Sequence, residues 1–444
     1  MKKAITFFLI LLSITLGSFA SGAQEENTAG DQEESTVPET TLEGTWEGAI
    51  SVQGQQLGII LRLTKKDTAY AGTIDIPQQN AYSIPLTDIS LEDNSVRFIL
   101  PSNPAQAVFQ GKAAGDELSG SFNQGGASGT FSAARVSDSG EIKQPEVPGK
   151  EEDVELPVEG GTLKGTLLIP EGNPPFPGVL IIPGSGPTDR NGNSAIAGRN
   201  DSLLKLAYGL AEKGYASLRI DKRGVGESVW PGMTEEDLTL DIYVEDTGRW
   251  LSFLQNLDQI TGTAVAGHSE GALVGAVTVR KSDTRALVSI AGMGESFGET
   301  IKRQLSPYPE EVRKEAARII NSLEQGKTVS DISESQIIQS LFRPSVQPYM
   351  ISILKYDPAE VVADIDVPVL IVQGTQDLQV TMAAAEKLAK AGKNAELKVI
   401  EDMNHVLKEV ENLEENQASY SDPSFPLADG LITVISGFLA DVIK

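Results

Sequence analysis

Short apolar runs separated by turn residues fill the chain between about Leu42 and Arg135. Gly, Asn, Asp and Pro separate these runs at roughly ten-residue intervals, a spacing typical of small antiparallel barrels and sandwiches. We therefore expect a small antiparallel β-domain over residues 41–136. The runs of β-type composition are 45–52, 57–63, 70–76, 96–100, 108–111, 118–122 and 130–133.

A different pattern begins at about residue 153, where strand-like runs alternate with helical ones. This alternation predicts an α/β fold, with a mostly parallel sheet and helices on both faces. The strand-like runs are 162–169, 178–182, 216–220, 262–266, 286–290, 367–372 and 396–400. The helical runs are 202–213, 239–257, 272–280 and about 426–443.

Three segments depart from these patterns. Residues 24–40 are acidic and polar without periodicity, which predicts a disordered tether. Residues 137–152 are rich in Pro, Glu and Lys and are expected to link the β-domain to the α/β domain over 153–444. Residues 295–354 are charged and helical in character, so we expect a helical cap over the carboxyl edge of the sheet.

The N-terminal stretch has the features of an export signal. Lys2 and Lys3 precede an apolar run from Ala4 to Leu16, and small residues follow up to Ala20 or Ala23. We expect a signal peptide over residues 1–23 and a secreted or periplasmic bacterial protein. The alternative is an uncleaved anchor, for which the run is short. No other stretch is apolar enough to span a membrane.

Composition narrows the function classes. The net charge is −26, which argues against nucleic acid or an anionic membrane as a partner, because both bind basic surfaces. The chain has no cysteine, which excludes disulfides, thiolate metal sites and a cysteine nucleophile. Oligomeric state stays open.

The sequence Gly267-His268-Ser269-Glu270-Gly271 lies between a strand-like and a helical run. A G-x-S-x-G pattern in that context predicts a nucleophile elbow, in which a tight turn exposes the serine oxygen. A second match centres on Ser296, but three residues separate it from the preceding strand-like run. Ser269 is therefore the predicted nucleophile, and Ser296 is interpreted as a loop residue.

A serine nucleophile needs a base, and the chain has two histidines. His268 adjoins Ser269, and a neighbouring side chain in an elbow points away from the serine oxygen. His405 follows the strand-like run 396–400 on a loop, from which an imidazole can reach the carboxyl edge of the sheet. We predict that His405 is the base.

The imidazole needs an acid to hold its tautomer and stabilise its charge. Asp377 lies in the loop after the run 367–372, next to the loop that carries His405. Thr381 is better placed than Asp377 to cap the helix that follows, which leaves Asp377 free for this role. Asp402 is the alternative, although it lies only three residues from His405. The chain order Ser, Asp, His is that of α/β-hydrolases.

An oxyanion hole needs two backbone N–H groups. Glu270, which follows the nucleophile, should supply one of them. The Gly-rich loop from Pro183 to Asn193 should supply the other from Ser185, with Gly184 as the alternative. Neither phosphate-binding glycine motif occurs in this loop.

The region from about residue 153 to 444 resembles the α/β-hydrolase superfamily. Asp221 to Ser228 is similar to its D-x-R-G-x-G-x-S segment, Val367 to Asp377 to its V-P-V-L-x-x-x-G-x-x-D segment, and Met403 to His405 to its histidine loop. Together with the preceding β-domain, the region resembles exported bacterial esterases often labelled as serine-peptidase-like hydrolases. Pro183 departs from the family pattern, since many relatives have His there.

The resemblance implies a carboxylesterase that acts on a small-molecule ester, with a preference for short acyl chains, through an acyl-enzyme and without metal or cofactor. One alternative is an aminopeptidase that uses the same triad and grips an amine through Glu299, Glu310 and Glu311 of the cap. A second alternative is a non-catalytic binding protein that uses the β-domain for adhesion.

Overall fold

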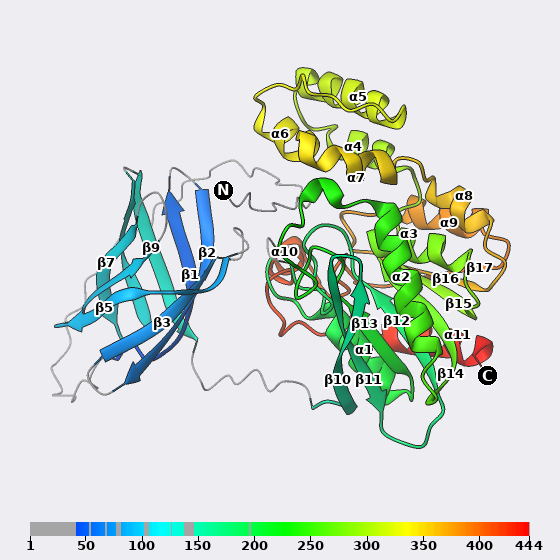
Figure 1. Ribbon diagram of the computed structural model, residues 1–444, viewed down its shortest axis with the longest axis horizontal. Helices are drawn as coiled ribbons and strands as arrows, with labels where there is room; N and C mark the ends of the chain where they lie inside the picture. The colour runs from blue at the N-terminus through cyan, green and yellow to red at the C-terminus, as the bar shows by residue number, and fades with distance from the viewer. Residues whose placement is uncertain are drawn as a thin grey trace. The chain divides into compact units, whose positions relative to one another are not determined.

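The computed structural model describes residues 41–52, 55–66, 69–76, 81–101, 106–125, 127–136, 146–194 and 197–443. The chain divides into two compact units, one ending at Lys143 and the other continuing from Gln144 (Figure 1). The predicted signal peptide (1–23), the predicted tether (24–40) and residues 137–145 of the predicted linker lie outside the described residues.

Within the described residues, the first unit is a nine-stranded antiparallel sheet in the order β4-β3-β2-β1-β9-β8-β7-β6-β5. The last strand therefore pairs with the first, and sequence neighbours pair everywhere else except between β4 and β5. The strands are β1 (Gly44–Val52), β2 (Gln55–Lys66), β3 (Ala69–Ile76), β4 (Ala81–Pro85), β5 (Thr87–Glu92), β6 (Ser95–Leu100), β7 (Ala107–Ala114), β8 (Glu117–Gln124) and β9 (Ala127–Val136).

Strands β4 and β5 were not predicted, and together they turn the sheet into a near-barrel. They form one extended segment that pairs with β3 through β4 and with β6 through β5. The register of the β5–β6 pair shifts between Thr87 and Ser90, and Asp88 has a φ of 55°. Such a bulge bends a strand at a barrel corner. Pro85 interrupts the apolar residues of this segment, and a proline within a run weakens a strand signal.

Phenylalanine rings fill the core of this unit. The rings of Phe98 and Phe109 stack with centroids 4.6 Å apart, and Phe131 meets both of them edge-on. Buried and exposed positions alternate along β6 and β7, as expected for strands with one face toward a core. The unit thus has a hydrophobic core of its own.

The second unit is built on an eight-stranded sheet, counted over the described residues, in the order β10-β11-β13-β12-β14-β15-β16-β17. The first two pairings in this order are antiparallel and the others are parallel. The strands are β10 (Gly149–Val158), β11 (Gly161–Pro170), β12 (Phe176–Ile182), β13 (Ala216–Ile220), β14 (Ile260–His268), β15 (Ala286–Ile290), β16 (Val369–Gly374) and β17 (Ala395–Ile400).

Strand β10 corrects the predicted domain boundary. It begins at Gly149, inside the segment expected to be a linker, and pairs with β11 as a hairpin. Its sequence is rich in Glu and Lys and it forms one edge of the sheet, so it lacks the apolar pattern of the inner strands. The second unit therefore starts before residue 153.

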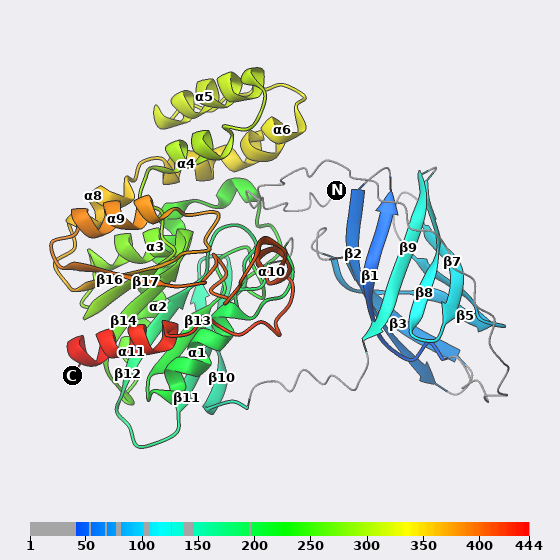
Figure 2. The same ribbon diagram turned by 180° about the vertical axis from the view of Figure 1, so that it is seen from behind.

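Helices cover both faces of this sheet. One face packs on α1 (Ser202–Glu212) and α11 (Leu431–Val442), as Figure 2 shows. The other face packs on α2 (Leu240–Gln255), α3 (Glu270–Val279), α8 (Pro358–Ala363) and α9 (Met382–Ala391). Helix α11 starts later than the predicted residue 426, directly after Gly430, whose φ is 80°.

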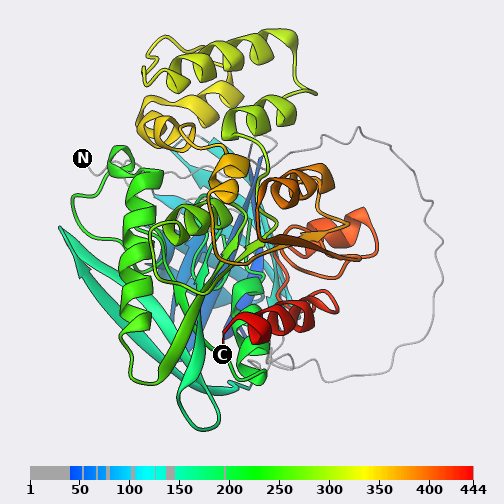
Figure 3. The same cartoon turned by 90° about the vertical axis from the view of Figure 1, so that its right-hand side faces the viewer.

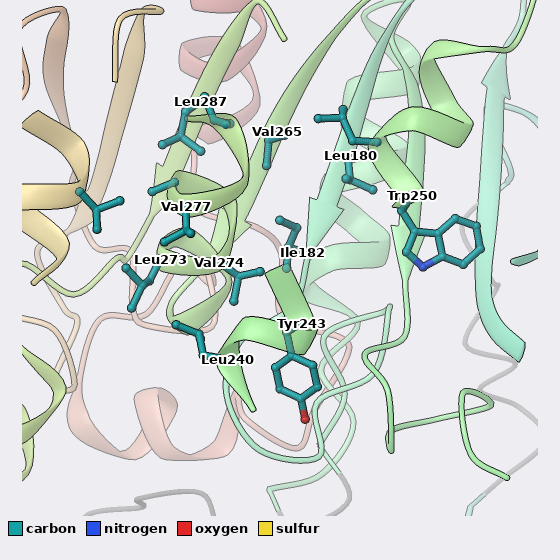
Figure 4. Packing of buried hydrophobic residues seen from close by; sticks show 14 of the residues in the cluster. Leu180, Ile182, Leu240, Tyr243, Trp250, Val265, Leu273, Val274, Val277 and Leu287 are labelled. Atoms are coloured by element: carbon teal, nitrogen blue, oxygen red, sulfur yellow. The ribbon is translucent and has the colours of Figure 1, made fainter. Parts of the chain in front are cut away.

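The core between the sheet and the helices α2 and α3 holds the centre of the unit in place. Figure 4 shows Leu180 and Ile182 of β12 and Val265 of β14 pointing toward Val274 and Leu240 of these helices. All ten residues of α3 are buried, and most of them are small, so the helix lies close to the sheet. This fixes the start of α3, which directly follows Ser269.

The predicted cap is present between β15 and β16. It consists of α4 (Phe297–Gln304), α5 (Glu310–Glu324), α6 (Gln336–Phe342) and α7 (Gln347–Ile353). Residues such as Ile301, Ile320 and Phe342 give it a core separate from that of the sheet. Figure 3 shows these helices as a layer of their own at one end of the unit. None of the helices that the structure describes is long and apolar enough to cross a membrane.

Candidate active site

Ser269 occupies a nucleophile elbow between β14 and α3. Its φ of 54° and ψ of −119° are sparsely populated by non-glycine residues. A side chain at Gly267 would collide with the backbone at Gly271, and one at Gly271 would lie 2.5 Å from the carbonyl oxygen of Ile182. Only glycine fits either position, so the close packing of this turn accounts for the G-x-S-x-G pattern.

The structure brings Ser269, His405 and Asp377 together. Nε2 of His405 lies 3.1 Å from Oγ of Ser269, and Nδ1 of the same ring lies 2.9 Å from Oδ2 of Asp377. The loops after β16 and β17 supply the acid and the histidine, and the elbow after β14 supplies the serine. These three side chains form the hydrogen-bonded chain that a serine nucleophile requires.

Asp377 is held as a carboxylate. Burial alone would raise its pKa, but the nearby charge of His405 and the hydrogen bond to that ring lower the pKa below its usual value. The N–H groups of Gln379 and Val380 donate to Oδ1 at 2.8 and 2.9 Å. An ionised Asp377 accepts a hydrogen bond from Nδ1–H of His405, which leaves Nε2 of the same ring free to accept the serine proton.

Thr381, Ser296 and Asp402 fill other roles. The hydroxyl of Thr381 accepts from the N–H of Ala384 and caps α9, as expected. Ser296 caps α4, accepting from the N–H of Glu299 at 3.3 Å. The N–H of Asp402 donates to Thr375, and the hydrogen bonds found for the His405 ring go to Asp377 and Ser269, not to Asp402.

His268 has a function that the sequence did not reveal. Nε2 of its ring lies 2.7 Å from the carbonyl oxygen of His405. Burial, together with the neighbouring His405, lowers the pKa of His268 to about 4, so the ring is neutral. Nε2 then carries the proton and donates it to the carbonyl, which supports the loop that holds His405.

Ser185 and Glu270 meet at the same cavity as Ser269 and His405. Among the described residues, the backbone N–H groups of Ser185 and Glu270 donate no hydrogen bond. Glu270 is the first residue of α3, where the helix dipole also favours negative charge. Gly184, the alternative donor, does not line the cavity and its carbonyl faces Lys222. The geometry therefore favours Ser185.

A buried charged cluster lies beside these two residues. Nζ of Lys222 donates to the carbonyl oxygen of Gly184 and lies 3.4 Å from Oε1 of Glu270. The hydroxyl of Tyr349, from α7 of the cap, donates to Oε2 of Glu270. Burial lowers the pKa of Lys222, and burial together with the charge of Glu270 raises the pKa of Tyr349. The sequence offered no signal that these residues would meet.

The D-x-R-G-x-G-x-S segment acts as scaffold. Asp221 is buried and accepts from the guanidinium of Arg190 at 2.7 Å. A side chain at Gly226 would collide with the carboxylate of Asp221, and the hydroxyl of Ser228 donates to the Asp221 carbonyl. The segment thus fixes the loop after β13, which carries Lys222.

The cavity has a volume of about 100 Å³ and lies between the sheet and the cap. Its walls are mainly apolar, with Leu238, Met293, Phe297, Ile301, Leu341 and Met350 among them. Glu299, Glu310 and Glu311 do not line it. Two carboxylates do, namely Glu270 and Glu235, and Glu235 pairs with Arg343 and Ser345.

Comparisons with known proteins agree with this architecture. A family model described as "Serine aminopeptidase, S33" matches residues 197–411. Esterase EstD of Thermotoga maritima is 28% identical over 274 residues, which cover 59% of this chain and 61% of that protein. The chain thus matches about three fifths of the length of this curated relative.

Two solved structures have weaker likeness. Est1E from Butyrivibrio proteoclasticus, with ferulic acid bound, is 21% identical, with 65% of this chain and 99% of that chain covered and a TM-score of 0.43. The Pyrococcus furiosus esterase Pf2001 is 16% identical, with 67% of this chain and 95% of that chain covered and a TM-score of 0.41. Strand order and elbow, together with the family match over residues 197–411, show that the second unit has an α/β-hydrolase fold.

Proposed function

We propose that the chain is a serine hydrolase that cleaves carboxylic esters through an acyl-enzyme. The observation that carries this proposal is the continuous hydrogen-bonded chain from Asp377 through His405 to Ser269 at the wall of a cavity. The relationship to an esterase supports the same reaction class.

The proposed reaction has two steps, acylation of Ser269 and hydrolysis of the acyl-enzyme. Oγ of Ser269 attacks the ester carbonyl while Nε2 of His405 takes its proton, and the carbonyl oxygen becomes an oxyanion near the N–H groups of Ser185 and Glu270. When the tetrahedral intermediate collapses, the C–O bond to the alcohol breaks and His405 returns the proton to the leaving oxygen. Water then attacks the acyl-enzyme with His405 as base, and the acid leaves.

The charges in the cavity favour an ester over a peptide with a free amine. An aminopeptidase needs a carboxylate available to the substrate ammonium group, because a buried cation requires a partner. The three cap carboxylates considered for this role lie outside the cavity, and both Glu235 and Glu270 already have cationic partners. These pairings support ester hydrolysis, with peptide hydrolysis as the alternative to be tested.

Polar atoms in the cavity wall point to the kind of acyl group. Tyr243 and Thr300 are buried, and their hydroxyls find no hydrogen-bond partner in the part of the chain that the structure describes, nor does Oε1 of Gln304. An acyl group that offered them a hydrogen bond would relieve a penalty of about 1–3 kcal/mol for each atom it paired, which an apolar group would not. The small cavity thus suits a short acyl group that carries a hydroxyl or another hydrogen-bonding group.

The test is a panel of p-nitrophenyl esters of increasing acyl length, assayed on the wild type and Ser269→Ala. We expect the wild type to prefer short chains and Ser269→Ala to lose all turnover. Aminoacyl p-nitroanilides in the same assay test the peptidase alternative, and faster turnover of these amides would establish it.

The preference for a polar acyl group has a separate test. Pairs of esters that differ by one hydroxyl on the acyl chain are compared in the wild type and in Thr300→Val, which keeps the side-chain shape. In the wild type we expect kcat/KM to be about tenfold higher for the hydroxylated ester. In Thr300→Val we expect this ratio to decrease. Equal kcat/KM values for both esters in the wild type would contradict the proposed preference for a polar acyl group.

A further inference from the structure

We propose that Lys222 is a positioning residue of the oxyanion hole, and that Tyr349 couples the cap to it. This inference rests on the proposed ester hydrolysis and adds residues outside the triad to it. The ammonium group of Lys222 contacts both segments that carry the N–H groups of the hole, which belong to Ser185 and Glu270.

Lys222 is placed to join two segments that are distant in sequence. It follows β13, its side chain is 4% exposed, and Nζ reaches Gly184 in the loop after β12 and Glu270 at the start of α3. The ring of Tyr243 also lies 5.4 Å from Nζ, a distance at which an aromatic face attracts a cation. The ammonium group therefore has a partner on each of three elements.

The contact with Gly184 determines the direction of the Ser185 N–H. The carbonyl of Gly184 and the N–H of Ser185 belong to one planar peptide unit, in which they point in opposite directions. Because Lys222 holds the carbonyl, the N–H is directed to the other side of the peptide plane. Without this hydrogen bond the peptide could rotate, and the donor would lose its alignment.

The contact with Glu270 is electrostatic as well as geometric. The carboxylate of Glu270 is 4% exposed and belongs to the residue whose N–H is the second donor. A buried negative charge so close to a developing oxyanion would oppose the reaction unless a cation compensates it. Lys222 supplies a cation 3.4 Å from this carboxylate. Its charge and its hydrogen bond to Gly184 therefore both favour formation of the oxyanion.

Tyr349 extends this network into the cap. Its hydroxyl donates to Oε2 of Glu270 from α7, and its ring lies 6.0 Å from that of Tyr243. The carboxylate of Glu270 is thus held between the cap and Lys222. The position of the cap therefore contributes, through Tyr349 and Glu270, to the alignment of the oxyanion hole.

A positioning role and a merely structural role predict different results for Lys222→Met. A structural ion pair would lower stability and leave transition-state binding unchanged in the protein that remains folded. A positioning role lowers kcat with little change in KM, and it weakens a trifluoromethyl ketone inhibitor, which forms an oxyanion on Ser269, by about the same factor as kcat/KM.

The experiment measures kcat, KM and inhibition by an aryl trifluoromethyl ketone for p-nitrophenyl acetate hydrolysis. We expect kcat to fall about 100-fold in Lys222→Met, with KM within about threefold of the wild-type value, and about 10-fold in Tyr349→Phe. The double variant Lys222→Met/Glu270→Gln removes both charges, and we expect it to recover part of the loss but not all, because the Gly184 carbonyl stays unheld.

Arg223→Met is the matched control. Arg223 follows Lys222 directly and forms a buried ion pair with Asp246 at 2.8 Å, but it contacts neither Gly184 nor Glu270. We expect lower stability, with kcat and inhibitor affinity both within about threefold of the wild-type values. If Lys222→Met does not fold, Tyr349→Phe and the double variant give the same readouts.

Two results would overturn the proposal. One is a kcat within threefold of the wild-type value in folded Lys222→Met or in the double variant. The other is a loss of kcat without a matching loss of inhibitor affinity. Failure of the proposed function itself would be recognised separately, since the wild type would then lack ester turnover or Ser269→Ala would retain it.

Discussion

The ring of His268 supports the backbone of His405. Nε2 of His268 lies 2.7 Å from the His405 carbonyl oxygen, and the two ring centroids are 5.0 Å apart. The residue next to the nucleophile therefore fixes the loop that carries the predicted base. Both histidines of the chain thus serve one site. The ring of His405 contacts Ser269, and the ring of His268 holds the main chain of His405.

The buried neutral ring of His268 predicts a pH-dependent stability. Its pKa is about 4 in the folded protein against an ordinary 6.5, so the unfolded chain binds a proton first as the pH falls. The free energy of unfolding should thus decrease between pH 6.5 and pH 4, by about 3 kcal/mol from this group. Urea unfolding at several pH values measures it.

His268→Gln is the control for this effect, because glutamine can donate a hydrogen bond to the same carbonyl but does not titrate. Asp377 also loses stabilisation as the pH falls, since its pKa is lowered in the folded state, and it does so in both proteins. The difference between them isolates His268. Parallel pH profiles for the two proteins would refute the assignment.

Removal of the hydrogen bond should also reduce catalysis. In His268→Leu the His405 loop loses its support, and a small displacement of the imidazole costs roughly 10- to 100-fold in kcat. His268→Gln should retain most of the activity. Steady-state hydrolysis of p-nitrophenyl acetate compares the variants, and equal kcat values in both would show that the contact has no positioning role.

Asp377 and Asp402 give a sharp comparison. Asp377→Asn leaves the shape of the site but takes away the carboxylate that sets the His405 tautomer, so we expect kcat to fall by about 10⁴. Asp402→Asn should stay within about threefold of the wild type. If Asp402→Asn produced the larger loss, the acid would have been assigned to the wrong residue.

The β-domain should unfold as a unit of its own. Phe109 is fully buried and contacts the rings of Phe98, Phe122 and Phe131, so Phe109→Ala should lower its free energy of unfolding by about 3–5 kcal/mol. Since the catalytic unit has separate cores, kcat for p-nitrophenyl acetate should not change. Scanning calorimetry and assays of both proteins check this, and a parallel loss of activity would reveal coupling between the units.

Much of the site could be predicted because its main features are local in sequence. The elbow requires glycine at Gly267 and Gly271, and the loops that carry Asp377 and His405 directly follow the strand-like runs 367–372 and 396–400. Parallel strands bring such loops to one edge of a sheet, so order along the chain implied closeness in space. The inner strands were predicted for a similar reason, since they are continuous apolar runs.

What could not be predicted depends on contacts between distant segments. Lys222, Glu270 and Tyr349 come from the loop after β13, the start of α3 and the cap, and no spacing in the sequence relates them. Strands β4 and β5 were missed because Pro85 interrupts their apolar residues, and β10 was missed because it is a largely charged edge strand. Glu299, Glu310 and Glu311 do not line the cavity, and this could not be predicted because their orientation depends on the packing of the cap.

The central claim is that Ser269 is the nucleophile, activated by His405. The most direct measurement is reaction with a fluorophosphonate followed by mass spectrometry of the digested protein. We predict one label, on Ser269, with loss of ester turnover in proportion to labelling, and no labelling of Ser269→Ala. A label on another residue, or full turnover in Ser269→Ala, would contradict the account.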